Sequence, residues 1–227
     1  MKTQKTLPIK FLVNRASAFL YKRKKNFPGS AMYWEQRYSK GGNSGSGSYN
    51  QLANFKAEVI NSFIKEKDIA SVIEFGCGDG NQLTLANYPK YIGLDVSATA
   101  IRICMNKFSN DRTKSFYLYD SYAFCDNHNI FKSELSLSLD VIFHLVEDDV
   151  FNKYMVHLFN ASTKYVIVYA SNIDGTPTQH ERHRKFTNWV DANQKNWQLI
   201  KTVENKYKYD KNNPDSTSLA DFYIYEK

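Results

Sequence analysis

Three glycines at every second position, directly after an apolar segment, constrain the fold of this chain more than any other feature. Gly76, Gly78 and Gly80 follow residues 72–75, whose β-branched members predict a buried strand. Glycine at such a turn allows positive φ angles and leaves the backbone bare, so that a ligand can lie directly against it. Residues 81–83 then predict the start of a helix, which makes the segment a strand–turn–helix unit.

An acidic residue follows the next predicted strand. Residues 91–94 have the apolar character of a strand and are followed by Asp95. A carboxylate about 20 residues beyond a glycine-rich turn is placed to accept hydrogen bonds from the hydroxyls of a ribose. Strand, glycine turn, helix, strand and acid together predict a site for the adenosine part of a cofactor.

The spacing of the glycines distinguishes among adenosine cofactors. Dinucleotide-binding enzymes carry G-x-G-x-x-G, whereas Glu74 begins the pattern acid-x-G-x-G-x-G in this chain. With Asp95 in register, the pattern resembles motif I of the class I S-adenosylmethionine (SAM) methyltransferases. The resemblance implies SAM as the cofactor, with NAD(P) or FAD as the alternative. It also implies an α/β fold: a Rossmann-like, seven-stranded, mostly parallel sheet of order 3-2-1-4-5-7-6 with an N-terminal helical cap.

The same resemblance assigns further residues to the cofactor. Residues 116–119 predict the third strand, and Asp120 after it would meet the adenine amino group; a simple turn aspartate is the alternative. The expected cofactor-binding residues are Tyr33, Glu74, Gly76, Cys77, Gly78, Gly80, Gln82, Asp95, Val96, Asp120, Ser121 and Leu139.

The length of 227 residues suits one α/β domain with a cap. We expect residues 1–56 to form an N-terminal helical cap with a lid, and residues 57–227 to form the SAM-binding domain as a single structural unit. The lid is the segment 39–50, whose glycine and serine content is also typical of a flexible linker. We expect it to close over cofactor or substrate. Lys56, on a predicted helix, is expected to be a surface charge rather than a ligand of a carboxylate.

The net charge of +7 comes from the N-terminus. Residues 1–34 contain eight basic side chains and no acidic one, so the rest of the chain has a net charge of −1. This distribution argues against nucleic acid as a partner, because a basic stripe beside the glycine turn is missing. The apolar and basic residues 1–25 fit a helix on a membrane surface or a helix packed on the domain. No apolar run reaches the roughly 20 residues of a membrane-spanning helix.

The cysteines Cys77, Cys104 and Cys125 show no paired spacing. This argues against a disulfide framework and against a zinc cluster. We therefore expect a cytoplasmic protein without a bound metal.

His144 is the expected general base. It follows the fourth predicted strand, residues 135–143, and ligands of open α/β sheets lie beyond the carboxyl ends of the strands. An ordinary histidine pKa near 6.5 suits proton removal at neutral pH. The alternative is a histidine that lines the cleft without transferring a proton. Glu147 would orient His144 or act as the base itself, while Asp148 and Asp149 would begin the next helix.

A segment rich in histidine and arginine follows the fifth predicted strand, residues 165–169. His180 and His183 have a spacing that fits metal ligands, but two ligands are insufficient. Arg182 and Arg184 indicate an anionic substrate, with a solvated basic loop as the alternative. The expected substrate-binding residues are Trp34, Arg37, Asn43, Ser44, His180, Arg182, His183 and Arg184. The last two strands, in residues 197–203 and 222–225, are expected to form an antiparallel pair.

Further segments extend the resemblance over nearly the whole chain. Residues 33–34, 41–45, 55–57, 138–149 and 183–186 resemble small bacterial methyltransferases associated with surface-polysaccharide (capsule or O-antigen) biosynthesis. This implies methyl transfer to an oxygen of a small anionic or sugar-derived acceptor, such as a nucleotide-activated sugar or a capsule phosphoramidate-type group. Two alternatives stay open: SAM-dependent methylation of RNA or protein, and a non-catalytic adenosine-binding interaction protein.

Overall fold

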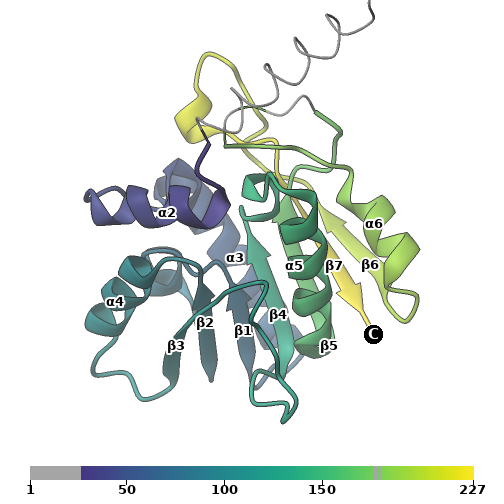
Figure 1. Ribbon diagram of the computed structural model, residues 1–227. Coiled ribbons are helices and arrows are strands. Elements are labelled where there is room, and N and C mark those ends of the chain that lie inside the picture. The colour runs from purple at the N-terminus through teal and green to yellow at the C-terminus, as the bar shows by residue number, and fades with distance from the viewer. Residues whose placement is uncertain (1–26, 176–177, 179) are drawn as a thin grey trace, which may run out of the picture.

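The computed structural model describes residues 27–175, 178 and 180–227 (Figure 1). The prediction of a surface or packing helix in residues 1–25 lies outside these residues. The strands are β1 (Val72–Phe75), β2 (Tyr91–Asp95), β3 (Lys114–Leu118), β4 (Ser133–Leu139), β5 (Ser162–Ala170), β6 (Gln198–Val203) and β7 (Asp221–Glu226). The α-helices are α2 (Ser30–Ser39), α3 (Asn50–Glu66), α4 (Ala98–Lys107), α5 (Asp148–Asn160) and α6 (Phe186–Asn193). Short 3₁₀ helices are η1 (Ser46–Ser48), η2 (Gln82–Leu85), η3 (Ile142–His144) and η4 (Pro214–Ser216).

A single seven-stranded sheet of order β3-β2-β1-β4-β5-β7-β6 lies at the centre (Figure 1). Strands β1 to β5 pair in parallel, while β7 runs antiparallel to both β5 and β6. The predicted strand order and the antiparallel last pair are confirmed. The order reverses between β1 and β4, and open α/β sheets bind ligands outside the carboxyl ends of the strands at such a point.

Two hydrophobic cores, one on each face of the sheet, follow from the alternation of side chains along the strands. Val72 of β1 lies in the first core with Ile60 of α3 and Ile101 of α4. The next residue, Ile73, lies in the second core with Met155 of α5. Because helices cover both faces, every residue of β1 is buried. The start of the glycine turn is therefore held rigidly in the centre of the sheet.

The helix predicted after the glycine turn is instead the four-residue 3₁₀ helix η2. Only residues 76–90 connect β1 to β2, and Pro89 restricts the residue before it to extended conformations. Too few residues are left after the turn for several helical turns and the return to the sheet.

The connection from β3 to β4 also consists of turns. The ring of Phe124 in this connection packs against Tyr119 and Phe131, with a distance of 5.4 Å between ring centroids in each pair.

Helix α2 lies over the carboxyl ends of the central strands (Figure 1). Its Glu35 accepts hydrogen bonds from Ser97 Oγ (2.7 Å) and Thr99 N (3.1 Å) at the start of α4. A carboxylate in this place satisfies free amides of the first helical turn and interacts favourably with the helix dipole. The predicted domain boundary at residue 56 falls inside α3, which is buried on both sides of that position. Among the described residues, no helix is long and apolar enough to cross a membrane.

Candidate functional site

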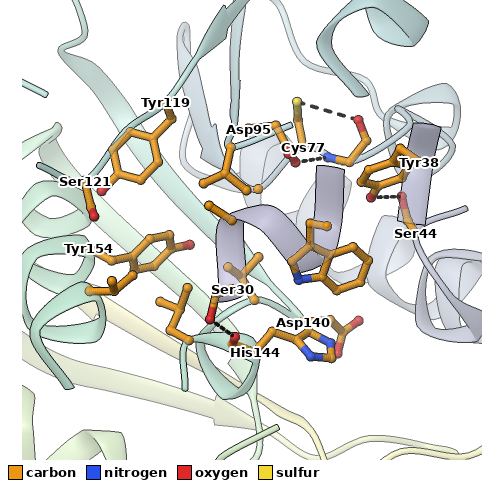
Figure 2. Close-up of a pocket in the computed structure, with 18 of the residues that line it drawn as sticks. Ser30, Tyr38, Ser44, Cys77, Asp95, Tyr119, Ser121, Asp140, His144 and Tyr154 are labelled. Carbon is orange, nitrogen blue, oxygen red and sulfur yellow. Dashed lines mark hydrogen bonds between the residues drawn. The ribbon is translucent and has the colours of Figure 1, made fainter. Parts of the chain in front are cut away.

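A cavity of about 500 Å³ lies beneath α2 at the carboxyl ends of β1, β2 and β4. Figure 2 shows Tyr119, Ser121 and Tyr154 on one side and Asp140 and His144 on the other. The predicted residues that line the cavity are Trp34, Ser44, Glu74, Gly76, Cys77, Gly78, Gln82, Asp95, Val96, Asp120, Ser121, Leu139, His144 and Glu147. The predicted residues outside its lining are Tyr33, Arg37, Asn43, Gly80, His180, Arg182, His183 and Arg184.

The glycine turn has the predicted positive φ angles: 86° at Gly76, 57° at Gly78 and 70° at Gly80. A Cβ atom at Gly78 would lie 2.3 Å from Ser44 Oγ, so only bare backbone fits at that position. A Cβ atom at Gly80 would instead lie 3.0 Å from Cys104 Sγ in α4. The first two glycines therefore border the cavity, and the third allows α4 to pack closely against the turn.

Asp95 is buried at the end of β2 and faces the glycine turn. Its two carboxylate oxygens accept hydrogen bonds from Gly78 N (2.9 Å) and Ser97 N (2.8 Å). Burial raises the pKa of Asp95 to about 6, although these backbone hydrogen bonds favour the ionised form. Each oxygen keeps a second lone pair, because a carboxylate offers about four acceptor directions. Asp95 can therefore accept further hydrogen bonds from a ligand in the cavity.

The segment predicted to be a lid is bound to the glycine turn through Asp79. Ser44 N and Tyr49 OH donate hydrogen bonds to Asp79 Oδ2 (3.0 and 2.8 Å), and Asp79 N donates one to Ser44 Oγ (3.0 Å). Tyr38 OH lies 3.0 Å from the same Ser44 oxygen. Asp79 was not singled out in the sequence, although its place between two of the glycines could have drawn attention to it. The segment thus forms one wall of the cavity.

Lys56 was expected on the surface, and this expectation is wrong. Its side chain is fully buried, and Lys56 Nζ lies 2.6 Å from Asp140 Oδ2. Lys56 lies one helical turn after Leu52 and one before Ile60, which are both buried, so helical spacing alone places it on the inner face of α3. Asp140, at the end of β4, has a φ of 58° and was not predicted as a site residue. Both partners line the cavity.

Glu74 lies close to this ion pair at the floor of the cavity. Tyr91 OH donates a hydrogen bond of 2.6 Å to Glu74 Oε2. Burial raises the pKa of Glu74 to about 7, while the Tyr91 hydroxyl and the charge of Lys56 favour ionisation. The acid of the glycine motif is therefore held in place by a hydrogen bond from within the protein.

His144 lies in η3, directly after β4. Its Nδ1 is 3.3 Å from the carbonyl oxygen of His180, and a carbonyl can only accept, so Nδ1 carries the proton. Nε2 is then the free acceptor nitrogen. Burial lowers the pKa of His144 to about 4, against the effect of the His180 carbonyl. This pKa is below the ordinary histidine value near 6.5, and the ring is neutral at pH 7. The indole of Trp34 packs edge-on against it, with ring centroids 5.0 Å apart.

Glu147 holds the start of α2. Its carboxylate accepts hydrogen bonds from Ser30 N (2.9 Å) and Ser30 Oγ (2.5 Å), and Ser30 Oγ also lies 2.8 Å from His144 O. A carboxylate is favourable at a helix N-terminus. We had expected Glu147 to orient the His144 ring or to act as the base. The contact that orients the ring is instead made by the carbonyl oxygen of His180. Glu147 thus connects the roof of the cavity to the strand end that carries His144.

The two arginines expected to bind an anionic substrate are already bound within the protein. Arg182 Nη1 and Arg184 Nη2 lie 2.9 and 3.2 Å from the carboxylate oxygens of Asp148. Both guanidinium groups also donate to Val146 O. They therefore fix the connection from β4 to α5.

Other predicted residues outside the lining of the cavity contact one another or neighbouring side chains. The rings of Tyr33 and His180 are stacked with centroids 4.8 Å apart, and Ser171 Oγ lies 2.6 Å from His183 Nδ1. Arg37 Nε donates a hydrogen bond of 2.6 Å to Asn43 O. Within the part of the chain that the structure describes, no group of three or more His, Cys, Asp or Glu residues could hold a metal ion.

Neither protein-family models nor curated protein sequences match this chain. Solved structures match its fold. The N-methyltransferase NodS from Bradyrhizobium japonicum WM9, in complex with S-adenosyl-l-homocysteine, has a TM-score of 0.66 at 11% identity, over 88% of this chain and 98% of that chain. Magnesium protoporphyrin IX methyltransferase (ChlM) from Synechocystis PCC 6803, with bound SAM, has a TM-score of 0.57 at 14% identity, over 99% and 100% of the two chains.

The methyltransferase domain of bacterial CtHen1-C has a TM-score of 0.60 at 18% identity, over 78% of this chain and 98% of that chain. At these identities the similarity establishes the fold alone. The chain has the fold of class I SAM-dependent methyltransferases.

Proposed function

We propose that this chain is a SAM-dependent methyltransferase that transfers a methyl group to an oxygen atom of a sugar-derived acceptor. One observation carries the proposal. The bare turn at Gly76 and Gly78 and the buried carboxylate of Asp95 meet at a cavity of about 500 Å³, within a methyltransferase fold. This volume is in the range of roughly 300–1,000 Å³ that is usual for small-molecule sites. NodS and ChlM, which share the fold, were crystallised with S-adenosyl-l-homocysteine and with SAM.

The polar groups of the cavity fit the parts of SAM in order. Asp95 would accept hydrogen bonds from the ribose hydroxyls, and Asp120 with Ser121 would border the adenine. The ion pair of Lys56 and Asp140 would hold the amino-acid end, because its ammonium and carboxylate match the carboxylate and ammonium of the ligand. The Gly78 backbone would lie against the cofactor, and Ser44 already occupies the space into which a Cβ atom at this position would point.

The chemistry places only modest demands on the protein. Bound SAM supplies an electrophilic methyl group on a sulfonium, so the protein has to align the acceptor and take up its proton. The oriented Nε2 of His144 is an acceptor for a hydroxyl proton, and the neutral ring is ready for it at pH 7. A general base contributes roughly 10²–10⁴-fold to the rate and is most efficient when its pKa is near the working pH, so the lowered pKa of His144 places its contribution at the low end of this range.

A sugar hydroxyl is the acceptor that the observations favour. The resemblance to surface-polysaccharide enzymes supports it, and so do the aromatic and carboxylate groups that line the cavity. RNA is the second candidate, because the small RNA methyltransferase HEN1 shares the fold with a TM-score of 0.56, although this chain spans only 26% of it.

Calorimetry with SAM, followed by mass spectrometry of possible acceptors, tests the proposal. The panel contains activated sugars, free glycosides and short RNAs. We expect SAM to bind and a sugar to gain the mass of one methyl group. Methylation of RNA alone would favour the second candidate. SAM binding without transfer to any member of the panel would favour a non-catalytic adenosine-binding protein, and absence of SAM binding would refute the cofactor assignment.

A further inference from the structure

We infer that the cavity, with its cofactor bound, excludes anions and takes an uncharged, hydroxyl-bearing acceptor. The substrate class would then be a neutral sugar or glycoside rather than a phosphorylated one. The inference rests on the proposed function, because it concerns the acceptor of that reaction. The charges around the cavity support it.

Acidic side chains outnumber basic ones in the lining of the cavity. The acidic residues in it are Glu74, Asp95, Asp120, Asp140 and Glu147. Among the described residues, Lys56 is the only lysine or arginine in that lining. Its side chain is wholly buried, and its ammonium lies 2.6 Å from Asp140 Oδ2. The positive charge of Lys56 is therefore already neutralised and is not available to an anionic acceptor.

Binding of the cofactor does not reverse the excess of negative charge in the cavity. SAM carries one net positive charge, because the charges of its amino-acid end cancel and the sulfonium remains. Burial raises the pKa of Glu74 to about 7 and that of Asp95 to about 6, so both can be partly protonated near neutral pH. The three other carboxylates still outnumber Lys56 and the sulfonium. A cleft with an excess of one sign of charge focuses its potential and lowers the local concentration of ions of that sign.

Three arginines outside the lining make contacts with other parts of the protein. Arg182 and Arg184 both bind the carboxylate of Asp148. Arg37 lies on α2, where its guanidinium is 5.5 Å from the ring centroid of Trp34 and its Nε donates to Asn43 O. His144 lacks a charge at pH 7, since burial lowers its pKa to about 4. A phosphate group would therefore find no free cation among the described lining residues.

The same lining suits a neutral polyhydroxyl molecule. An uncharged acceptor needs no cation to balance it, and the indole of Trp34 offers an apolar ring to the carbon face of a sugar. The acceptor nitrogen of His144 completes the site, because it can take the proton of the hydroxyl that is methylated.

Collisional quenching of Trp34 fluorescence measures the potential inside the cavity directly. The chain has three tryptophans, and Trp189→Phe with Trp197→Phe leaves Trp34 as the only emitter in the full chain. Iodide and caesium are the probes, with each quenching constant divided by that for free N-acetyltryptophanamide. The protein is measured alone and saturated with S-adenosyl-l-homocysteine, with saturation checked by calorimetry. We expect the normalised caesium constant to exceed the iodide constant by about threefold in both states.

Two variants assign this preference to its source. Asp140→Asn removes one carboxylate and leaves Lys56 unpaired, so the caesium preference should fall. Arg37→Gln removes a cation that lies outside the lining, beside Trp34, and should leave the preference intact or enlarge it. Equal quenching by both ions, or stronger quenching by iodide, would overturn the inference even if the cofactor binds. Absence of cofactor binding would instead refute the proposed function, so the two failures are distinguishable. Faster methylation of a sugar phosphate than of the matched free sugar would also overturn the inference.

Discussion

Lys56 and Asp140 form an ion pair across 84 residues of sequence, with Nζ 2.6 Å from Oδ2 and no part of the lysine side chain exposed. Lys56 comes from α3, before the first strand, and Asp140 directly follows β4. The ring of Tyr169 lies beneath the ammonium, with its centroid 5.3 Å away. A buried charge is tolerated only when it is paired, so each partner depends on the other.

Substitution of one partner should therefore lower the free energy of unfolding more than substitution of both. We expect Lys56→Met to lower the free energy of unfolding by about 3 kcal/mol, because it leaves the Asp140 carboxylate unpaired in a largely buried place. Lys56→Met combined with Asp140→Asn should recover at least about 1 kcal/mol of this loss. Urea denaturation of the wild type, both single variants and the double variant measures the coupling. Strictly additive effects would show that the two side chains do not depend on each other.

The glycine turn permits a test with a matched control. Gly78 has a φ of 57°, and a Cβ there would lie 2.3 Å from Ser44 Oγ and 3.0 Å from Tyr38 OH. We expect Gly78→Ala to weaken SAM binding at least about tenfold, because the added atom collides with Ser44 and Tyr38, and both must shift although they line the cavity. Gly41→Ala is the control, since Gly41 also has a positive φ (81°) but no neighbour within 4 Å of the added atom. Both variants carry backbone strain, and only the first displaces residues that line the cavity. Equal loss of SAM affinity in the two would assign the effect to strain.

Asp95 should make SAM binding depend on pH. Ribose hydroxyls donate to the ionised carboxylate, so SAM binds the ionised form better and lowers its pKa in the complex. Since the pKa of free Asp95 is about 6, affinity should be constant above that pH and fall by up to about tenfold per pH unit below it. Calorimetry between pH 5 and pH 8 measures this directly. Asp95→Asn should bind more weakly at pH 8 and lose the dependence near pH 6. A dependence that survives in Asp95→Asn would point to Glu74 instead.

Local motifs predicted the cofactor half of the site, because its parts lie close together in sequence. The glycine turn and Asp95 are separated by a short connection. In the structure they are joined by a hydrogen bond from Gly78 N to Asp95 Oδ2. The sheet order followed from the resemblance that this motif carries. Such predictions need no knowledge of how distant segments pack.

The contacts that build the rest of the site join distant segments, and no local pattern specifies them. Asp79 is 35 residues from Ser44, and Glu35 is 62 residues from Ser97. Lys56 was the exception, because its helical spacing from buried Leu52 could have revealed that it points inward. Arg182 and Arg184 were interpreted as free cations because Asp148, their partner, was assigned only to a helix start.

His144 separates methyl transfer assisted by a base from transfer by positioning alone. If Nε2 takes the acceptor proton, His144→Ala should lower kcat by about two orders of magnitude and leave SAM affinity nearly unchanged. A rise in KM for the acceptor with little change in kcat would show that the ring only lines the cavity.

The pH profile adds a second, independent criterion for His144. With SAM at saturation, the contribution of Asp95 to binding is removed, and the acid limb of kcat/KM reports the base in the SAM-bound enzyme. Because the pKa of His144 is lowered to about 4, the wild type should keep its activity from pH 8 down to pH 5. A solvated histidine would instead lose activity below about pH 6.5. A limb near pH 6.5 that disappears in His144→Ala would show that the ring is the base but is open to water in the working enzyme. That result would contradict the desolvated position of the ring, in which Nδ1 is bound to the His180 carbonyl.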